Sequence, residues 1–301
     1  MNRYLISVVG PTAIGKTSLS IALAKHFNTE IVSSDSRQFY KEMQIGTAVP
    51  SNEELTAAPH HFIQHISIED DYNVGTFEKD AIETLETLFK TKNVAVMVGG
   101  SGLYIKAITE GLDDFPDVDP NLREQLNKRL RTEGISSLQE DLKTLDKKSY
   151  DAIAIDNPQR LLRALEISIG TGKPYSSFLN KKQTERQFKT ITIGLTAERT
   201  LIYDRINARV DQMVESGLLE EAKSLYGKKH LNALNTVGYK ELFKYFDGEW
   251  TLNFSISEIK KNTRRFAKRQ LTWFRKDPDI EWFDYSAPVT EITSYIESQF
   301  N

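Results

Sequence analysis

Short apolar runs alternate along the chain with longer segments of helical periodicity. The apolar runs predict buried strands at residues 4–9, 30–34, 93–98 and 188–195, and an edge strand at 280–285. The periodic segments predict helices over 76–92, from Thr196 or Glu198 through Met213, over 257–276, and in the tail from Thr290. This alternation is typical of an α/β fold with a mostly parallel sheet and flanking helices.

The pattern changes character in the middle of the chain. Residues 113–120 form an acidic linker marked by two prolines. Beyond it, helical patterns follow one another at 122–130, 138–145 and 158–169 without a β-rich stretch. We therefore predict a helical insertion domain over 114–186, inside a core domain made of residues 1–113 and 187–301.

The first predicted strand leads into a glycine-rich loop of the G-x-x-x-x-G-K-[ST] type. Its residues are Gly10, Pro11, Thr12, Ala13, Ile14, Gly15, Lys16 and Thr17. A strand before the loop and a helix after it form the context in which this motif holds a diphosphate on backbone N–H groups. Lys16 would reach the outer phosphate, and the Thr17 hydroxyl would ligate Mg²⁺. A turn that binds nothing is the simpler alternative, but the context favours a phosphate-binding P-loop.

Two other strand ends should open onto the same crevice, since parallel strands present their carboxyl ends together. The strand at 30–34 ends at Asp35, and the strand at 93–98 runs into Gly99-Gly100-Ser101-Gly102. An isolated Asp35 would most simply cap a helix, but a shared crevice with a diphosphate favours a chemical role. The second glycine-rich segment alone is a weak signal, because a tight turn explains it equally well.

Residues 58–66 contain a cluster of histidines that suggests a metal site. In a strand, His60 and His65 would point to opposite faces, while His61 and His65 would lie too far apart to share one ion. We expect structural or substrate-facing histidines instead.

Cations gather on two predicted helices. Arg205 and Arg209 lie one turn apart and could clamp phosphate, although surface arginines are usually only solvated. On the helix over 257–276, the predicted buried stripe is Ile259, Phe266, Leu271 and Phe274, and from residue 260 onward no acid accompanies the cations Lys260, Lys261, Arg264, Arg265, Lys268, Arg269, Arg275 and Lys276. This run favours a polyanion such as RNA over plain solvated surface.

Composition narrows the class of protein. The 301 residues are 39% hydrophobic and 27% charged, as in ordinary globular proteins, and the net charge is −3, so any nucleic acid must meet a local basic surface. With no cysteine, disulfides and thiolate zinc sites are excluded, and a cytoplasmic location is expected. No apolar run is long enough to span a membrane.

A P-loop most often belongs to a kinase or NTPase. Those enzymes usually hold Mg²⁺ with an Asp at the end of a second hydrophobic strand. The run over 93–98 ends in Gly-Gly, so only Asp35 qualifies. A kinase for a nucleotide or a small metabolite is consistent with these features.

A series of motifs extends from Gly10 to Arg275 and so covers most of the chain. In order they are GPTAIGKT, SSDSRQFYKEMQIGTAVP, AAPHHFI, VGGSGLYIKAI, NPQRLLRALEI and TRRFAKRQLTWFR. Each is weak alone, but the ordered set closely resembles the tRNA dimethylallyltransferase family. A chain that stops at Asn301 without a cysteine resembles the short bacterial form, because larger eukaryotic members add a zinc finger.

The resemblance implies a reaction and its partners. The family transfers a dimethylallyl group from dimethylallyl diphosphate to the exocyclic amine of the adenosine 3′-adjacent to the tRNA anticodon, and diphosphate leaves. We therefore expect Mg²⁺ as cofactor, dimethylallyl diphosphate and the anticodon stem-loop of tRNA as partners, no membrane, and a monomer.

The resemblance also implies roles for particular residues. Asp35 would be the general base, Ser101 stands where the family often has threonine, and Arg209 matches the arginine that binds diphosphate, with Arg205 as a weaker candidate. The residues implied to contact tRNA are Asp35, Ser36, Arg37, Gln38, Ser101, Arg123, Gln159, Arg160, Leu161, Leu162 and Arg163.

Other functions remain as alternatives at this point. An isopentenyltransferase acting on free AMP would need neither the basic helix nor the helical insertion. A P-loop kinase or NTPase would hydrolyse ATP or transfer its phosphoryl group. A non-catalytic RNA-binding module would leave the P-loop without a purpose.

Overall fold

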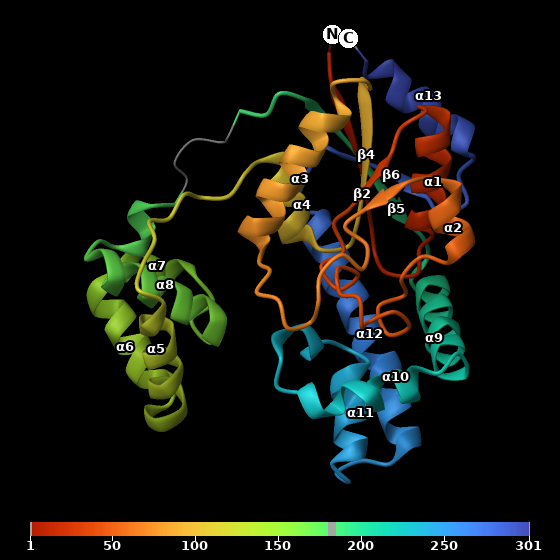
Figure 1. The fold of residues 1–301 in the computed structure, drawn as a ribbon. Helices are drawn as coiled ribbons and strands as arrows, with labels where there is room; N and C mark the ends of the chain where they lie inside the picture. Colours follow the sequence, from red (N-terminus) through yellow and green to blue (C-terminus); the bar gives the residue numbers. More distant parts are fainter. Residues whose placement is uncertain (1, 180–184, 301) are drawn as a thin grey trace. The chain divides into compact units, whose positions relative to one another are not determined.

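A single parallel sheet forms the centre of the core domain. The computed structural model describes residues 2–179 and 185–300, and within them six parallel strands lie in the order β3-β2-β4-β1-β5-β6 (Figure 1). The strands are β1 (Tyr4–Val9), β2 (Ile31–Ser33), β3 (His60–His61), β4 (Val94–Val98), β5 (Lys189–Thr196) and β6 (Ile280–Asp284). The predicted α/β class with a parallel sheet is confirmed, and β6 is an edge strand as predicted.

Helices cover both faces of this sheet (Figure 1). From β1, Tyr4, Ile6 and Val8 join one apolar cluster, which includes α1 (Lys16–His26) and α13 (Val289–Ser298). Leu5 and Val9 join the opposite cluster, which includes α3 (Val74–Leu88) and α4 (Gly102–Thr109). Because both faces are buried, β1 has to be apolar at nearly every position, and this explains its clear sequence signal.

A group of helices extends the core domain beyond the sheet. It consists of α9 (Arg199–Glu215), α10 (Leu218–Leu225), α11 (Tyr239–Phe246) and α12 (Leu252–Phe274), with short 3₁₀ turns η2 (Tyr226–Lys228) and η3 (Asn232–Leu234). These helices share an apolar cluster around Tyr239, which is completely buried. The sequence analysis predicted no helix or strand over residues 216–256, so it missed α10 and α11.

The segment around the histidines is not one extended strand. Only His60 and His61 pair with the sheet, and Phe62 and Gln64 then adopt positive φ angles of 63° and 47°. These left-handed residues turn the chain away from the sheet. The short helix α2 (Asn52–Ala57) precedes this segment and begins with a capping box between Ser51 and Glu54.

The chain divides into two compact units, Met1–Glu110 with Arg186–Asn301, and Gly111–Glu185. The second unit, the insertion unit, contains α5 (Pro120–Glu133), α6 (Ile135–Leu145), α7 (Lys147–Ala152), α8 (Pro158–Thr171) and η1 (Tyr175–Ser177). Helices α5 and α8 begin with a side-chain cap, from Asp119 and Asn157, followed by proline in the first turn. The unit has its own apolar cluster, so it folds around a core of its own.

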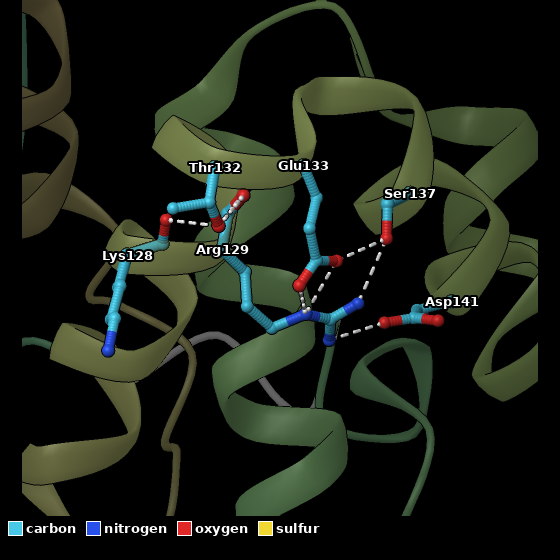
Figure 2. Close-up of polar contacts among 6 residues, drawn as sticks. All are labelled: Lys128, Arg129, Thr132, Glu133, Ser137 and Asp141. Carbon is cyan, nitrogen blue, oxygen red and sulfur yellow. Dashed lines mark hydrogen bonds and ion pairs between the residues drawn. The ribbon is translucent and has the colours of Figure 1, made fainter.

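A polar network connects α5 with α6 (Figure 2). The Arg129 guanidinium contacts both oxygens of Glu133 in its own helix, and it donates to Asp141 Oδ2 at 2.7 Å and to Ser137 Oγ at 3.0 Å in α6. These groups are partly exposed, so the network contributes orientation more than stability.

No helix in the part of the chain that the structure describes is long and apolar enough to cross a membrane.

Two leucines of α6 provide a matched test of the insertion core. Leu138 is fully buried, whereas 42% of Leu145 is exposed. We expect Leu138→Ala to lower the free energy of unfolding of the insertion unit by about 2–5 kcal/mol, because it leaves a cavity, and Leu145→Ala by well under about 1 kcal/mol. Hydrogen exchange of α6 amides under native conditions measures both. Equal effects would contradict an independent core.

Candidate active site

The loop from Gly10 to Thr17 has the conformation of an anion cradle. Gly10 has φ 141° and lies so close to β5 that a Cβ would sit 2.7 Å from the Leu195 carbonyl oxygen. Gly15, with φ 110°, is the N-cap of α1 and offers no side chain to cap it. The first-turn N–H groups of α1 are therefore left for a ligand, and the helix dipole favours an anion there.

Lys16 is partly buried and its side chain folds back onto this loop. Its Nζ donates to the carbonyl oxygens of Gly10 at 3.0 Å and Pro11 at 2.7 Å. Burial lowers the pKa of Lys16 to about 8, while nearby Asp35 raises this pKa and Arg209 lowers it further. A partly buried ammonium without a paired carboxylate favours a bound anion.

The two arginines of α9 differ in their roles. Arg205 Nε donates to the Ala13 carbonyl oxygen at 2.7 Å, and its guanidinium stacks over Tyr285 at 5.4 Å, so it supports the loop from outside. Arg209 is partly buried. Burial lowers its pKa, and the nearby positive charge of Arg205 lowers it further. Among the described residues, none forms a hydrogen bond or salt bridge with the Arg209 guanidinium, which leaves it available to an anion.

Asp35 stands where β2 ends, with Ser36 beside it. Asp35 Oδ1 accepts a hydrogen bond from the Arg37 N–H at 3.1 Å, and the described residues provide no other hydrogen bond to this carboxylate. Its second oxygen is therefore free to accept a proton. Ser36 contacts Ser101 through its N–H at 3.3 Å and its hydroxyl at 3.2 Å, so the ends of β2 and β4 are joined.

The side chains of Arg37 and Gln38 are already used within the protein. Arg37 Nη1 donates to the carbonyl oxygens of Asn232 and Ala233 at 3.2 and 2.9 Å. Gln38 Nε2 donates to those of Thr47 and Ala48 at 3.2 and 2.8 Å. Both side chains shape the walls of the site, and an RNA contact would have to use what remains exposed of them.

Gln270 of α12 connects the two glycine-rich loops, and sequence reasoning missed it. This buried side chain accepts from the Thr12 N–H at 2.9 Å and donates to the Gly100 carbonyl oxygen at 3.0 Å. A Cβ at Gly100 would lie 2.1 Å from the Gln270 amide nitrogen, so a larger residue there would displace this amide from its two contacts. The available signal was one uncharged polar residue on the buried side of a strongly basic helix.

Two cavities meet at these residues. The first, the loop cavity, has a volume of about 600 Å³ and is lined by the P-loop, Asp35, Glu54, His60, Arg205 and Arg209. The second, the aromatic cavity, has about 540 Å³ and is lined by residues that include Ser36, Ser101, Leu103, Tyr104, Arg269 and Trp273. The side chains common to both include Asp35, Arg209 and Gln270. Both volumes suit small-molecule or base-sized ligands.

Helix α12 differs in part from its prediction. Phe266 is not in the buried stripe; it is 39% exposed and lines both cavities, whereas the buried positions are Ser255, Ile259, Ala267, Gln270 and Phe274. The cation run is also less free than expected, because Lys260 pairs with Asp211 and Lys261 with Glu258. The cations nearest the aromatic cavity include Arg269, which lies over Phe266 at 5.6 Å.

The predicted RNA contacts of the insertion unit differ in their exposure and in their partners within the protein. Arg123 donates to Gln159 Oε1 at 2.6 Å, and both Arg123 and Arg163 pair with Glu166, at 3.6 and 2.9 Å. Arg160 and Arg163 are exposed.

Leu161 and Leu162 cannot contact RNA in the folded unit, because both are fully buried in its core. Their inclusion among the contacts was wrong, and they hold α8 in place instead.

The histidines take separate local partners. His61 Nε2 contacts Glu30 Oε2 at 2.7 Å, and His60 Nδ1 contacts the Ala58 carbonyl oxygen at 2.8 Å while the ring lines the loop cavity. His65 packs against Phe39 and Tyr72. The described residues contain no cluster of three or more His, Cys, Asp or Glu side chains that could hold a metal ion.

Comparisons with known proteins show the family of the chain. The sequence matches the IPP transferase family over residues 38–277. It is 66% identical to a tRNA dimethylallyltransferase of Christiangramia forsetii over 301 residues, covering 100% of both chains, and 58% identical to one of Flavobacterium johnsoniae, covering 98% and 97%.

Solved structures give the same result. A full-length tRNA isopentenylpyrophosphate transferase of Bacillus halodurans superposes with a TM-score of 0.74 at 38% identity, covering 99% of this chain and 96% of the other. A eukaryotic dimethylallyltransferase acting on tRNA superposes with a TM-score of 0.85 at 25% identity, covering 99% and 81%.

The fold and the site define an α/β transferase of the P-loop type. The chain belongs to the IPP transferase family, and its activity is that of a tRNA dimethylallyltransferase.

The lowered pKa of Lys16 makes anion binding dependent on pH. Below about pH 8 the ammonium is charged, and above it the charge is lost, so affinity for a diphosphate should fall as the pH rises. Because a bound anion stabilises the charged form, binding should also take up a proton above pH 8. We expect affinity for inorganic diphosphate to drop on the order of tenfold between about pH 7.5 and 9.5.

Calorimetric titration of the purified protein measures this drop. Lys16→Met should bind weakly at every pH, whereas Lys25→Met, at an exposed position of the same helix, should behave like the wild type. An unchanged pH profile in Lys16→Met would remove Lys16 from diphosphate binding.

Proposed function

We propose that this enzyme transfers the dimethylallyl group of dimethylallyl diphosphate to the exocyclic amine of the adenosine 3′-adjacent to the tRNA anticodon. The bond between the allylic carbon and oxygen breaks, and its electron pair leaves with diphosphate. The amine forms the new carbon–nitrogen bond, and its proton passes to Asp35. The observation that carries this proposal is that Asp35 lines both cavities, so one carboxylate can serve two ligands that enter separately.

The loop cavity is suited to the diphosphate. The P-loop amides, the α1 N-terminus, Lys16 and Arg209 provide donors and positive charge where the negative charge of the leaving group develops. Donors held in place by the fold, in a site partly closed to water, stabilise that charge without a reorganisation cost. Arg205 keeps Ala13 in position and so acts on the loop itself.

Mg²⁺ fits the oxygen donors present. Thr17 lines the loop cavity with Asp35, and the described residues form no acidic cluster for an all-protein site. Mg²⁺ commonly binds through a few protein oxygens, substrate phosphates and water. When bound, it would neutralise part of the diphosphate charge, with Thr17 as its protein ligand.

The aromatic cavity is suited to the adenine. The amine of adenine is a poor nucleophile because its lone pair is delocalised into the ring, and a base that accepts its proton localises that pair. Asp35 has one carboxylate oxygen held by the Arg37 amide and the other available. The joined hydroxyls of Ser36 and Ser101 can donate to the base at the mouth of this cavity.

The RNA would be gripped outside the cavities. The target base must leave its stack, at a cost of a few kcal/mol, which contacts to the rest of the stem-loop offset. Candidates for these contacts are the exposed cations of α12 and, in the insertion unit, Arg123, Arg160 and Arg163. RNA stem-loops are recognised in this way through shape and phosphates.

Label transfer tests the proposed substrates. Radiolabelled dimethylallyl diphosphate is incubated with Mg²⁺ and two acceptors side by side, an unmodified tRNA with adenosine next to its anticodon, and AMP. We expect label in the tRNA alone. Label in AMP alone would assign the free nucleotide as substrate. Label in neither would contradict prenyl transfer and favour a P-loop kinase or NTPase that uses ATP.

Substitution of Asp35 tests its role as base. Asp35→Asn keeps the size of the side chain but cannot accept the proton, so kcat should fall about 10²- to 10⁴-fold while the affinity for tRNA changes little. Single-turnover kinetics and filter binding separate the two effects. Asp279→Asn, at an exposed position, is the control. Near-normal turnover in Asp35→Asn would rule out this carboxylate as the base.

A further inference from the structure

A short loop forms a wall that the two cavities share. We call residues 44–48 the wall loop. Thr47 and Ala48 line both cavities, Gly46 lines the aromatic cavity, and Gln44 and Ile45 line the loop cavity. The position of this loop therefore helps to set the passage in which the prenyl carbon and the amine must meet.

One carboxylate from outside the site holds the wall loop. Glu221, in the first turn of α10, accepts hydrogen bonds at Oε2 from the N–H groups of Gln44 at 3.0 Å and Ile45 at 2.7 Å. Its Oε1 accepts from the Gly46 N–H at 2.9 Å and the Tyr239 hydroxyl at 2.6 Å. Hydrogen bonds to an ionised acceptor are roughly twice as strong as neutral ones, and here a single carboxylate satisfies three consecutive amides.

Packing fixes the same contact. Tyr239 is fully buried, and a Cβ at Gly46 would lie 2.7 Å from its ring, so the loop rests directly on this side chain. Further along the loop, Gln38 donates to the carbonyl oxygens of Thr47 and Ala48. The wall loop is thus clamped between α10–α11 and the segment that carries Asp35.

We infer that Glu221 is a positioning residue for prenyl transfer, an inference that rests on the proposed function. It is not among the described residues that line either cavity, so it acts through the wall loop and not on a substrate. Misplacement of reacting groups by about 1 Å can cost on the order of 10²-fold in rate. Loss of the carboxylate should therefore slow the chemical step more than it weakens binding.

Glu221→Gln tests this inference. Both carboxylate oxygens of Glu221 accept hydrogen bonds from backbone N–H groups, but the NH₂ group of glutamine cannot accept one, so at least one of these contacts is lost. We expect kcat for prenyl transfer to tRNA to fall at least about tenfold, with KM for both substrates changed less than about threefold. Glu220→Gln is the matched control, since Glu220 lies in the same helical turn but is exposed. Its kinetic constants should equal those of the wild type.

Tyr239→Phe provides a second, milder variant. It removes the phenol hydrogen bond but leaves Glu221 on the three amides, so kcat should fall by a smaller factor than in Glu221→Gln, again without a matching rise in KM. An unchanged kcat in folded Glu221→Gln, or in Tyr239→Phe should Glu221→Gln not fold, would overturn the inference. So would a loss of kcat that only follows a loss of folded protein, measured by circular dichroism and active-site titration.

The wild-type enzyme distinguishes a failure of the proposed function from a failure of the role of Glu221. Absence of label transfer by the wild-type enzyme would overturn the proposed function itself. Transfer by the wild type with equal kcat in Glu220→Gln and Glu221→Gln would leave that function intact and reject only the role of Glu221.

Discussion

The pair of hydrogen bonds made by Gln270 holds the site together. One amide group contacts the P-loop at Thr12 and the second glycine-rich loop at Gly100, so α12 sets the spacing between the ends of β1 and β4. These loops are next to each other because β1 and β4 are adjacent parallel strands. The sheet thus brings the loops to one edge, and a single buried side chain fixes their separation.

The charges of the site follow from this arrangement. Lys16 and Arg209 are both partly buried, and burial lowers the pKa of each, while the charge of Arg209 lowers that of Lys16 further. Two such cations near each other repel without an anion, and Asp35 offsets this repulsion only in part. A bound diphosphate would relieve the repulsion, and the fold holds the cations in place before the ligand binds, which is a form of preorganisation.

Much of the fold was predictable because the physical constraints on it are local. Burial on both faces made β1 apolar at nearly every position, and the P-loop needs glycine at positions where a side chain would collide or be strained. The motif residues Asp35, Lys16 and Ser101 were found for the same reason. Their roles as base, phosphate ligand and hydroxyl donor stay predictions.

What the sequence could not reveal depends on contacts between distant segments. Phe266 is apolar and was therefore assigned to the core, but an apolar side chain is also what a cavity wall needs. Glu221 looks like any surface acid of a helix, and only the fold brings it under residues 44–46. The buried Leu161 and Leu162 show the converse error, since a motif contains scaffold residues as well as contact residues.

The separate core of the insertion unit has an evolutionary consequence. Residues 111–185 bury their own leucines, and the chain enters and leaves this unit only once. Its surface can therefore change without disturbing the packing of the sheet. The same modularity makes the segment a natural unit for exchange between relatives, because its core would move with it.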